Sequence, residues 1–123
     1  MTNPFKDQAQ FMRACGQTVA VENLVQAELY NDLVWEEFHE FVSAANDVER
    51  ADATIDLIVV LIGYAHSMGW PLAALWAEVH RSNMDKVDPK TGAVQRRDDG
   101  KILKPEGWKP PEIDRILAWE HLK

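Results

Sequence analysis

Residues 34–42 read Val-Trp-Glu-Glu-Phe-His-Glu-Phe-Val, and this stretch decides the fold. Its apolar residues continue a helical spacing that begins at Leu24, so we expect a helix over about 22–45 with one buried face. The acidic residues keep the same periodicity. Glu37 and Glu40 are three apart and Glu36 and Glu40 are four apart, so each pair shares a helix face.

The same periodicity predicts helices on either side of this one, and Gly and Pro mark their ends. They are expected over residues 4–15, about 48–67, about 71–84 and about 112–122. Between the last two lie four of the six prolines and three of the six glycines, and Asp98-Asp99-Gly100 could form a hairpin turn. The sequence therefore predicts one all-α domain over 1–123. We expect a bundle of four to five helices as a core over 4–85, and an irregular basic arm with a short C-terminal helix over 86–123.

Composition narrows the function classes. The chain has 123 residues, a formal net charge of −7 and a single cysteine, Cys15. Stable nucleic-acid binding is disfavoured because phosphate backbones need clustered cations. No apolar stretch approaches the length of a membrane span. With one cysteine and no signal-like start, a cytoplasmic location is expected, or the host cytoplasm if the gene belongs to a phage. Seven of the thirteen Lys and Arg residues nevertheless lie between 86 and 109.

A second acidic pair lies on the next helix. Asp52 and Asp56 are four apart, and Asp56 stands inside the apolar run from Ile55 to Ile62, where an unpaired carboxylate is costly. Two helices with facing carboxylates would supply the oxygen ligands that Mg²⁺ or Mn²⁺ prefers. Acidic helix faces are more often simply solvated, and spacing alone leaves both interpretations open. Asp56 is the residue that solvation explains least well.

A di-iron bundle is a further alternative. Glu36 and His39 match the Glu-x-x-His ligand pair of that architecture, but it needs a second such pair and the sequence contains none.

The order of these motifs resembles the all-α NTP pyrophosphatase superfamily, which includes MazG-like and phosphoribosyl-ATP pyrophosphohydrolase-like proteins and is related to dimeric dUTPases. Its pattern is Glu-Glu-x-x-Glu on one helix and Glu-x-x-Asp on the next. Glu36-Glu37-x-x-Glu40 matches the first part and Asp56 the final aspartate, while Ala53 stands where the family has glutamate. A shifted alternative is Glu49-x-x-Asp52. The resemblance extends over about 20–111, through residues 80–86 and the basic tail.

This resemblance implies hydrolysis of a nucleoside triphosphate to the monophosphate and pyrophosphate, with two or more Mg²⁺ or Mn²⁺ ions. The implied ligands are Glu37, Glu40 and Asp56, with Asp52 in place of the glutamate absent at 53. Glu36 is expected to hold a further ion or to orient the attacking water, so Glu36 and Glu37 are the catalytic candidates. The implied phosphate or sugar contacts are Asn83, Lys86, Lys101 and Lys104, in the same or a neighbouring subunit, and Arg81 is left undecided.

The base is expected to lie against the first two helices, where an apolar stack and a few directed hydrogen bonds could form a slot. Gln8, Phe11, Met12 and Asn31 are the candidates, and they favour a purine deoxynucleotide, dGTP before dATP. Family members pair helices from two chains, so the resemblance implies a homodimer or a dimer of dimers. A non-catalytic helical interaction module, which Ala53 favours, remains the other alternative.

Overall fold

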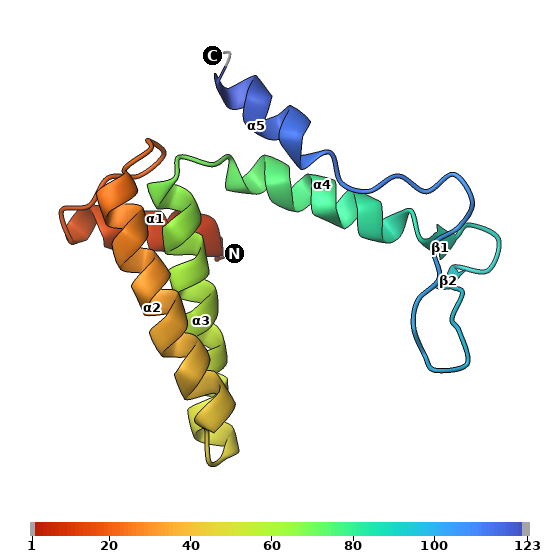
Figure 1. Cartoon of the computed structure of the whole chain (residues 1–123), viewed down its shortest axis with the longest axis horizontal. Helices are drawn as coiled ribbons and strands as arrows, with labels where there is room; N and C mark the ends of the chain where they lie inside the picture. Colours follow the sequence, from red (N-terminus) through yellow and green to blue (C-terminus); the bar gives the residue numbers. More distant parts are fainter. Residues whose placement is uncertain (1, 122–123) are drawn as a thin grey trace. The chain divides into compact units, whose positions relative to one another are not determined.

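The computed structural model describes the backbone of residues 2–121 and the side chains of residues 2–118 (Figure 1). The all-α prediction is confirmed, since the helices account for most of the described chain. They are α1 (Pro4–Ala14), α2 (Leu24–Ser43), α3 (Asp47–Ser67), α4 (Leu72–Met84) and α5 (Ile113–His121). The chain divides into two compact units, residues 1–72 and 73–123. We expected α4 to belong with the helical core, whereas almost all of it groups with the arm; the single-domain prediction stays a prediction.

Side-chain caps fix the starts of α2 and α3. The Asn23 side chain accepts a hydrogen bond from the Gln26 amide at the start of α2. At the start of α3, Asn46 Oδ1 accepts from the Glu49 amide, and Glu49 Oε2 accepts from the Ala45 amide, each at 2.9 Å. The Gln26 and Glu49 amides belong to first helical turns and have no partner within their helices, whereas the Ala45 amide belongs to the short connection between α2 and α3, which this contact ties to α3.

The end of α3 depends on a glycine. Gly69 has φ +72°, a conformation that side chains with a Cβ rarely adopt, and it follows the last helical turn. A Cβ at this position would lie 3.0 Å from the Glu22 backbone nitrogen, so the chain returning from α3 passes close to the segment that enters α2. We predicted this glycine as the end of the third helix, and the prediction is confirmed.

The core of the first unit lies among three helices. α2 and α3 run antiparallel side by side (Figure 1), and Met12 of α1, Tyr30 of α2 and Val60 of α3 form the buried cluster. Gly63 of α3 lies against the Tyr30 ring, which occupies the space where a Cβ would stand. The Tyr30 hydroxyl donates to Gln17 Oε1 at 2.6 Å. The absence of a side chain at 63 thus sets how closely the two helices approach.

Polar contacts at one end of the α2–α3 pair were not expected from the sequence. Gln26 is buried, and its Nε2 donates to the Thr18 carbonyl and to Ser67 Oγ, both at 2.8 Å. Thr18 donates its amide to Gln26 Oε1 at 3.0 Å, so both ends of the amide are satisfied. His66 Nε2 lies 2.8 Å from the Phe5 carbonyl oxygen. These bonds join α1 and its following loop to the ends of α2 and α3.

The second unit contains α4, the irregular arm and α5. Its two-stranded antiparallel sheet is β1 (Val87–Asp88) and β2 (Ala93–Val94), which the sequence did not predict. The hairpin expected around Asp98–Gly100 is also present as a short bridge between Arg96 and Ile102, closed by the Arg97 amide donating to the Lys101 carbonyl.

Candidate functional site

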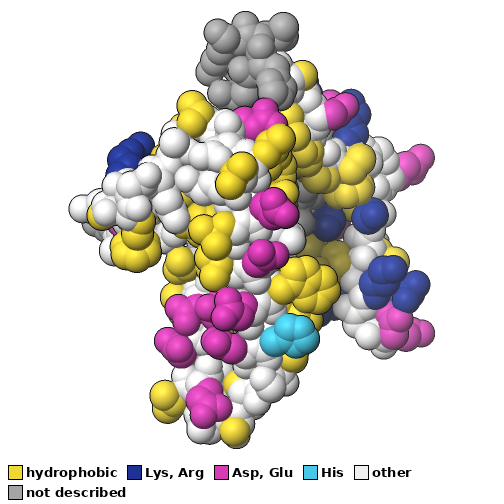
Figure 2. Space-filling view, turned by 60° about the vertical axis from the view of Figure 1, so that its left-hand side comes forward, with side chains coloured by type: hydrophobic (Ala, Val, Ile, Leu, Met, Phe, Trp, Pro, Cys, Tyr) yellow, Lys and Arg dark blue, Asp and Glu magenta, His cyan; other side chains and the backbone are white. Residues whose placement is uncertain are grey.

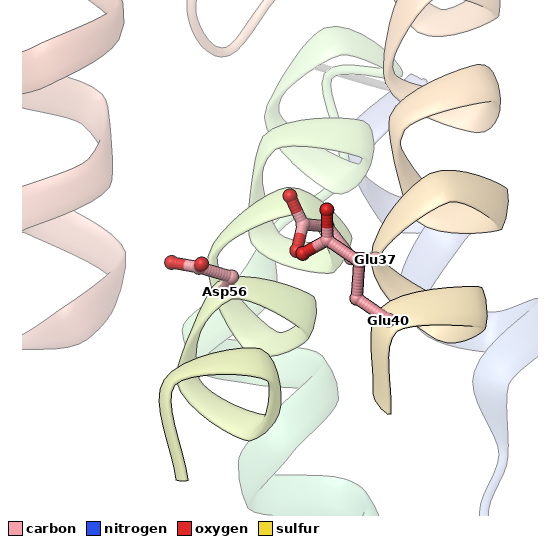
Figure 3. A group of neighbouring side chains, drawn as sticks. All are labelled: Glu37, Glu40 and Asp56. Carbon is pink, nitrogen blue, oxygen red and sulfur yellow. The ribbon is translucent and has the colours of Figure 1, made fainter. Parts of the chain in front are cut away.

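Three carboxylates of α2 and α3 lie close together. Glu37 and Glu40 lie one turn apart on α2 and extend toward α3, which carries Asp56 (Figure 3). One oxygen from each of the three lies within 4.8 Å of the others. The tight α2–α3 connection and the antiparallel pairing bring together residues that are up to 19 positions apart in the sequence. The structure therefore gathers three of the five residues expected to bind metal.

Glu37 is the most constrained member of this carboxylate cluster. Its Oε2 atom is buried and has no hydrogen-bond partner among the described residues. Burial, followed by the charge of Glu40 and a hydrogen bond to it, raises the pKa of Glu37 to about 7, and Asp56 and Glu36 add smaller contributions. A buried oxygen without a donor costs on the order of 1–3 kcal/mol. Among the described residues, this carboxylate therefore has no positive partner.

Asp52 and Glu36 lie at the edge of the cluster. Burial raises the pKa of Asp56, and the next cause is Asp52, one turn earlier on α3, through its charge; a hydrogen bond between the two adds a smaller contribution. Glu36 is exposed and affects Glu37 only through its charge. Neither is among the three clustered oxygens. Ala53, at the family's glutamate position, is 3% exposed and lies within the packed part of α3.

The cluster fits a hard divalent cation. Oxygens that share one Mg²⁺ at about 2.1 Å lie at most about 4.2 Å apart, so the 4.8 Å limit here would need only a small side-chain adjustment. All three donors are carboxylates, and one has a lone pair buried without a partner. No histidine belongs to the group, which does not favour the di-iron alternative. His39 is exposed and has ring contacts to Trp35 and Phe38, with centroids 6.1 and 6.3 Å away.

The surface around the cluster is both acidic and apolar. Figure 2 shows acidic side chains gathered over the lower part of the α2–α3 pair, among exposed hydrophobic side chains. The exposed hydrophobic residues of these two helices are Leu24, Val25, Leu29, Trp35, Phe38, Phe41, Val42, Val48, Ile55, Ile58 and Leu61. Exposed apolar surface of this extent often marks a site of interaction.

Of the four residues expected to contact the base, two are exposed and two are buried. Phe11 and Asn31 are exposed on α1 and α2. Met12, in contrast, is fully buried in the core cluster, and Gln8 is also buried. A core residue cannot stack on a base without opening the core. The positions of Gln8 and Met12 therefore give no support to a role in base binding, which stays a prediction.

Two of the arm lysines meet at Trp108. Lys86 Nζ lies 5.2 Å and Lys104 Nζ 4.8 Å from the centroid of the indole ring. Lys86 Nζ also donates to Asn83 Oδ1 at 3.2 Å, so three of the four expected phosphate contacts lie close to one ring. The side chain of the fourth, Lys101, is exposed, and its backbone amide donates to Asp99 Oδ1.

Arg81, left undecided by the sequence, belongs to a structural network. Its guanidinium donates to both carboxylate oxygens of Glu78, at 2.9 and 2.8 Å, and to Asp85 at 2.7 Å. Glu78 Oε2 also accepts from the Glu112 amide at 2.7 Å. The Arg81 hydrogen bonds, followed by the Glu112 amide, lower the pKa of Glu78 to about 2. Arg81 thus holds the Glu78 carboxylate, and that carboxylate links α4 to the residue before α5.

A comparison with protein families identifies the chain. The model of the phosphoribosyl-ATP pyrophosphohydrolase family matches residues 13–83, more than half of the sequence. This chain belongs to the phosphoribosyl-ATP pyrophosphohydrolase family. The expected resemblance to the all-α NTP pyrophosphatase superfamily is therefore confirmed, and membership supports a nucleotide pyrophosphohydrolase activity. No curated protein matches the chain.

The family match contains the carboxylate cluster and Asn83 but ends before Lys86. The resemblance expected for the basic tail lies outside the matched residues.

Within the described residues, no helix is both long and apolar enough to cross a membrane.

Trp108 and Glu78 are the residues that sequence reasoning missed. A signal for the first is present, because a tryptophan within the lysine-rich segment 101–109 is a natural cation–π acceptor. A signal for the second is the spacing of Glu78, Arg81 and Asp85, which lie three and four apart on one helix.

Proposed function

We propose that this protein is a divalent-metal-dependent nucleoside triphosphate diphosphohydrolase that converts a (d)NTP and water to the (d)NMP and pyrophosphate. The observation that carries the proposal is the cluster of Glu37, Glu40 and Asp56, which contains a buried carboxylate oxygen with no donor. Family membership supports the reaction class, because the family cleaves a pyrophosphate bond of a nucleotide. In this reaction the water oxygen forms a new bond to phosphorus, the α–β phosphoanhydride bond breaks, and pyrophosphate leaves with its electron pair.

The carboxylates divide into ligands and supporting residues. Glu37, Glu40 and Asp56 are the principal ligands, since their oxygens already converge. Asp52 is the additional ligand, because it lies one turn before Asp56 on α3 and its charge is the second cause of the raised pKa of Asp56. Mg²⁺ or Mn²⁺ bound there, two or more ions per site, would neutralise phosphate charge and make water more acidic. Glu36, exposed beside Glu37, holds a further ion or orients the attacking water.

The substrate's polar groups are assigned to separate residues. The phosphate or sugar of the substrate is bound by Asn83, Lys86, Lys101 and Lys104. Lys86 Nζ donates to Asn83 Oδ1 at 3.2 Å, so these two side chains lie close enough to contact the same group. For the base, exposed Phe11 and Asn31 are the better-placed candidates. The proposed substrate is a purine deoxynucleotide, and dGTP is the first to test.

The protein is proposed to act as a homodimer or a dimer of dimers. The exposed apolar residues of α2 and α3, such as Val25 at 82% exposure, support this assembly because a second copy would remove them from water. Sedimentation equilibrium of the full chain tests it, and a monomer at micromolar concentration would contradict it.

The activity is tested by incubating the purified chain with each NTP and dNTP in the presence of Mg²⁺ or Mn²⁺. Monophosphate, pyrophosphate and orthophosphate are then separated and quantified. The proposal expects monophosphate and pyrophosphate in equal amounts, with no turnover in EDTA. No turnover of any nucleotide would refute the proposal, and monophosphate with orthophosphate alone would indicate stepwise phosphate removal instead.

A further inference from the structure

Two lysines of the second unit share one aromatic ring and no carboxylate. Lys86 Nζ and Lys104 Nζ lie 5.2 and 4.8 Å from the centroid of Trp108. The two nitrogens therefore cannot be more than about 10 Å apart, the sum of these distances. Both distances are within the roughly 6 Å range at which a ring face attracts a cation. The ring brings together two like charges that would otherwise separate.

The ring itself is held in place by backbone contacts. Trp108 Nε1 donates to the Ser82 carbonyl at 2.6 Å, and the Trp108 amide donates to the Pro105 carbonyl at 3.1 Å. Ser82 is buried in α4, so the ring is fixed against a helix although it belongs to an irregular segment. Lys86 Nζ also donates to Asn83 Oδ1, and Asn83 lies on α4, as Ser82 does.

The carboxylates nearby do not neutralise these lysines. Among the described side chains, neither Lys86 nor Lys104 forms an ion pair. Asp85 is paired with Arg81 at 2.7 Å, and Asp88 accepts a hydrogen bond from the Lys90 amide. Lys86, Asp85 and Asp88 line an open cavity of about 460 Å³, together with Glu106. Of these three acids only Asp85 is paired with a cation, so Asp88 and Glu106 keep their negative charges near Lys86 without forming an ion pair with it among the described side chains.

We infer that Trp108 is a positioning residue whose ring holds Lys86 and Lys104 as a pair of cations that binds a polyphosphate chain. The inference rests on the proposed function, because it assigns the phosphate-binding role of that substrate to a specific geometry. Two fixed cations favour a ligand with several linked phosphates over a single phosphate, since only the former can contact both at once. Lysine serves here as a point charge, and the ring supplies the direction that a flexible side chain lacks.

The test measures binding of inorganic triphosphate and of orthophosphate to the full chain by calorimetry in EDTA at low salt. Lys86→Met and Lys104→Met are each expected to weaken triphosphate binding roughly tenfold, as loss of one charge-assisted contact would. Trp108→Leu is expected to weaken it by a similar factor although it removes no charge. Trp108→Phe keeps a ring and should stay within about threefold of the wild type. Lys90→Met is the matched control, an exposed arm lysine without a ring contact, and should bind normally.

A spectroscopic readout separates positioning from a purely structural role. The ring current should shift the ε-methylene resonances of Lys86 and Lys104, and these shifts should persist in Trp108→Phe and vanish in Trp108→Leu. If the tryptophan only supported the arm through its bond to Ser82, Trp108→Phe would lose as much affinity as Trp108→Leu. That result, unchanged binding by Trp108→Leu, or an equal loss in Lys90→Met would each overturn the inference.

The failure of this inference and the failure of the proposed function are distinguishable. A chain that binds triphosphate in the expected pattern but turns over no nucleotide contradicts the hydrolase proposal alone. A chain that hydrolyses a nucleotide with an unchanged KM in Trp108→Leu contradicts the inferred lysine pair alone.

Discussion

Glu37 of the first unit and Glu78 of the second are two glutamates that the same chain treats in opposite ways. Glu37 has a buried oxygen without a donor and lies beside two other carboxylates, and its pKa is raised to about 7. Glu78 accepts three hydrogen bonds, from the Arg81 guanidinium and the Glu112 amide, and its pKa is lowered to about 2.

The difference separates a ligand site from a structural contact. Around Glu78 the fold supplies every donor that a carboxylate needs, so nothing further is required there. Around Glu37 the fold adds more negative charge and withholds donors, which leaves an electrostatic cost that a cation would remove. The same contrast separates Arg81, whose guanidinium is fully engaged, from Lys86 and Lys104, which rest on a neutral ring.

The largest expected effect comes from removing the charge of the cluster. Glu40→Gln and Asp56→Asn keep the size of each side chain but remove a metal ligand, so each should lower turnover at least ~100-fold, about 2.7 kcal/mol of activation free energy. Steady-state rates at saturating Mn²⁺ measure this. Circular dichroism should show unchanged helix content.

Glu28→Gln is the control for that experiment, because it makes the same chemical change at an exposed position of α2 outside the cluster. It should retain turnover within about twofold, as surface substitutions usually do. If either cluster variant keeps near-normal turnover, the assignment of that residue as a ligand is wrong.

A second way to disturb the first unit is to separate the two helices that carry the cluster. Gly63→Ala would place a Cβ where the Tyr30 ring lies, and this should lower the free energy of unfolding by about 1–3 kcal/mol. Chemical denaturation measures the loss. The double variant with Tyr30→Leu, which removes the ring, should recover part of it. An unchanged stability of Gly63→Ala would mean that the helices can part without cost.

Much of the fold of the first unit could be predicted from the sequence, because this unit consists of periodic helices. The period of apolar residues placed α2 and α3 within two residues of their observed bounds, and Gly69 marked an end correctly. The boundary between the units, which assigns α4 to the arm, could not be predicted, because it depends on contacts such as Trp108 to Ser82 that join residues far apart in the sequence.

The carboxylate cluster was predictable for a similar reason. Glu37 and Glu40 share a helix face by spacing alone, and Asp56 was conspicuous in an apolar run. The sequence could not show that Met12 would be in the core, since exposed Phe11 beside it is equally apolar and only the rotation of α1 against α3 distinguishes them. Nor could it show that two lysines would converge on one tryptophan.

A smaller effect concerns stability in EDTA. Because the pKa of Glu37 is raised to about 7, the folded state binds a proton more tightly than the unfolded state, whose glutamate titrates near 4.5. The contribution of Glu37 to stability should therefore be most favourable below about pH 4.5 and be lost as pH rises toward about 7. Glu37→Gln removes this penalty and should be more stable than the wild type at pH 8 by about 1–2 kcal/mol, with little difference at pH 4.

Adding Mn²⁺ should reverse that order, because the ion stabilises only the protein that retains the full ligand set. Denaturation curves of the wild type and of Glu37→Gln are required under four conditions, which are the two pH values with EDTA and with Mn²⁺. If Glu37→Gln is destabilised at pH 8 in EDTA, Glu37 contributes a favourable contact and the interpretation of its buried oxygen is wrong.

The smallest expected effect belongs to the second unit and is local. Glu78→Gln replaces a carboxylate that joins Arg81 to the Glu112 amide with a neutral group, so that amide should exchange with solvent roughly tenfold faster while global stability changes little. Since the pKa of Glu78 is lowered to about 2, the wild-type contact should be fully present above about pH 4.5 and be lost as pH falls toward about 2. Glu106→Gln, an exposed change in the same arm, is the control and should leave the exchange rate unaltered. Equal exchange rates in Glu78→Gln and the wild type would show that the start of α5 is held by other contacts. Glu78 and Glu37 would then differ in their pKa values, but Glu78 would have no structural role at the start of α5.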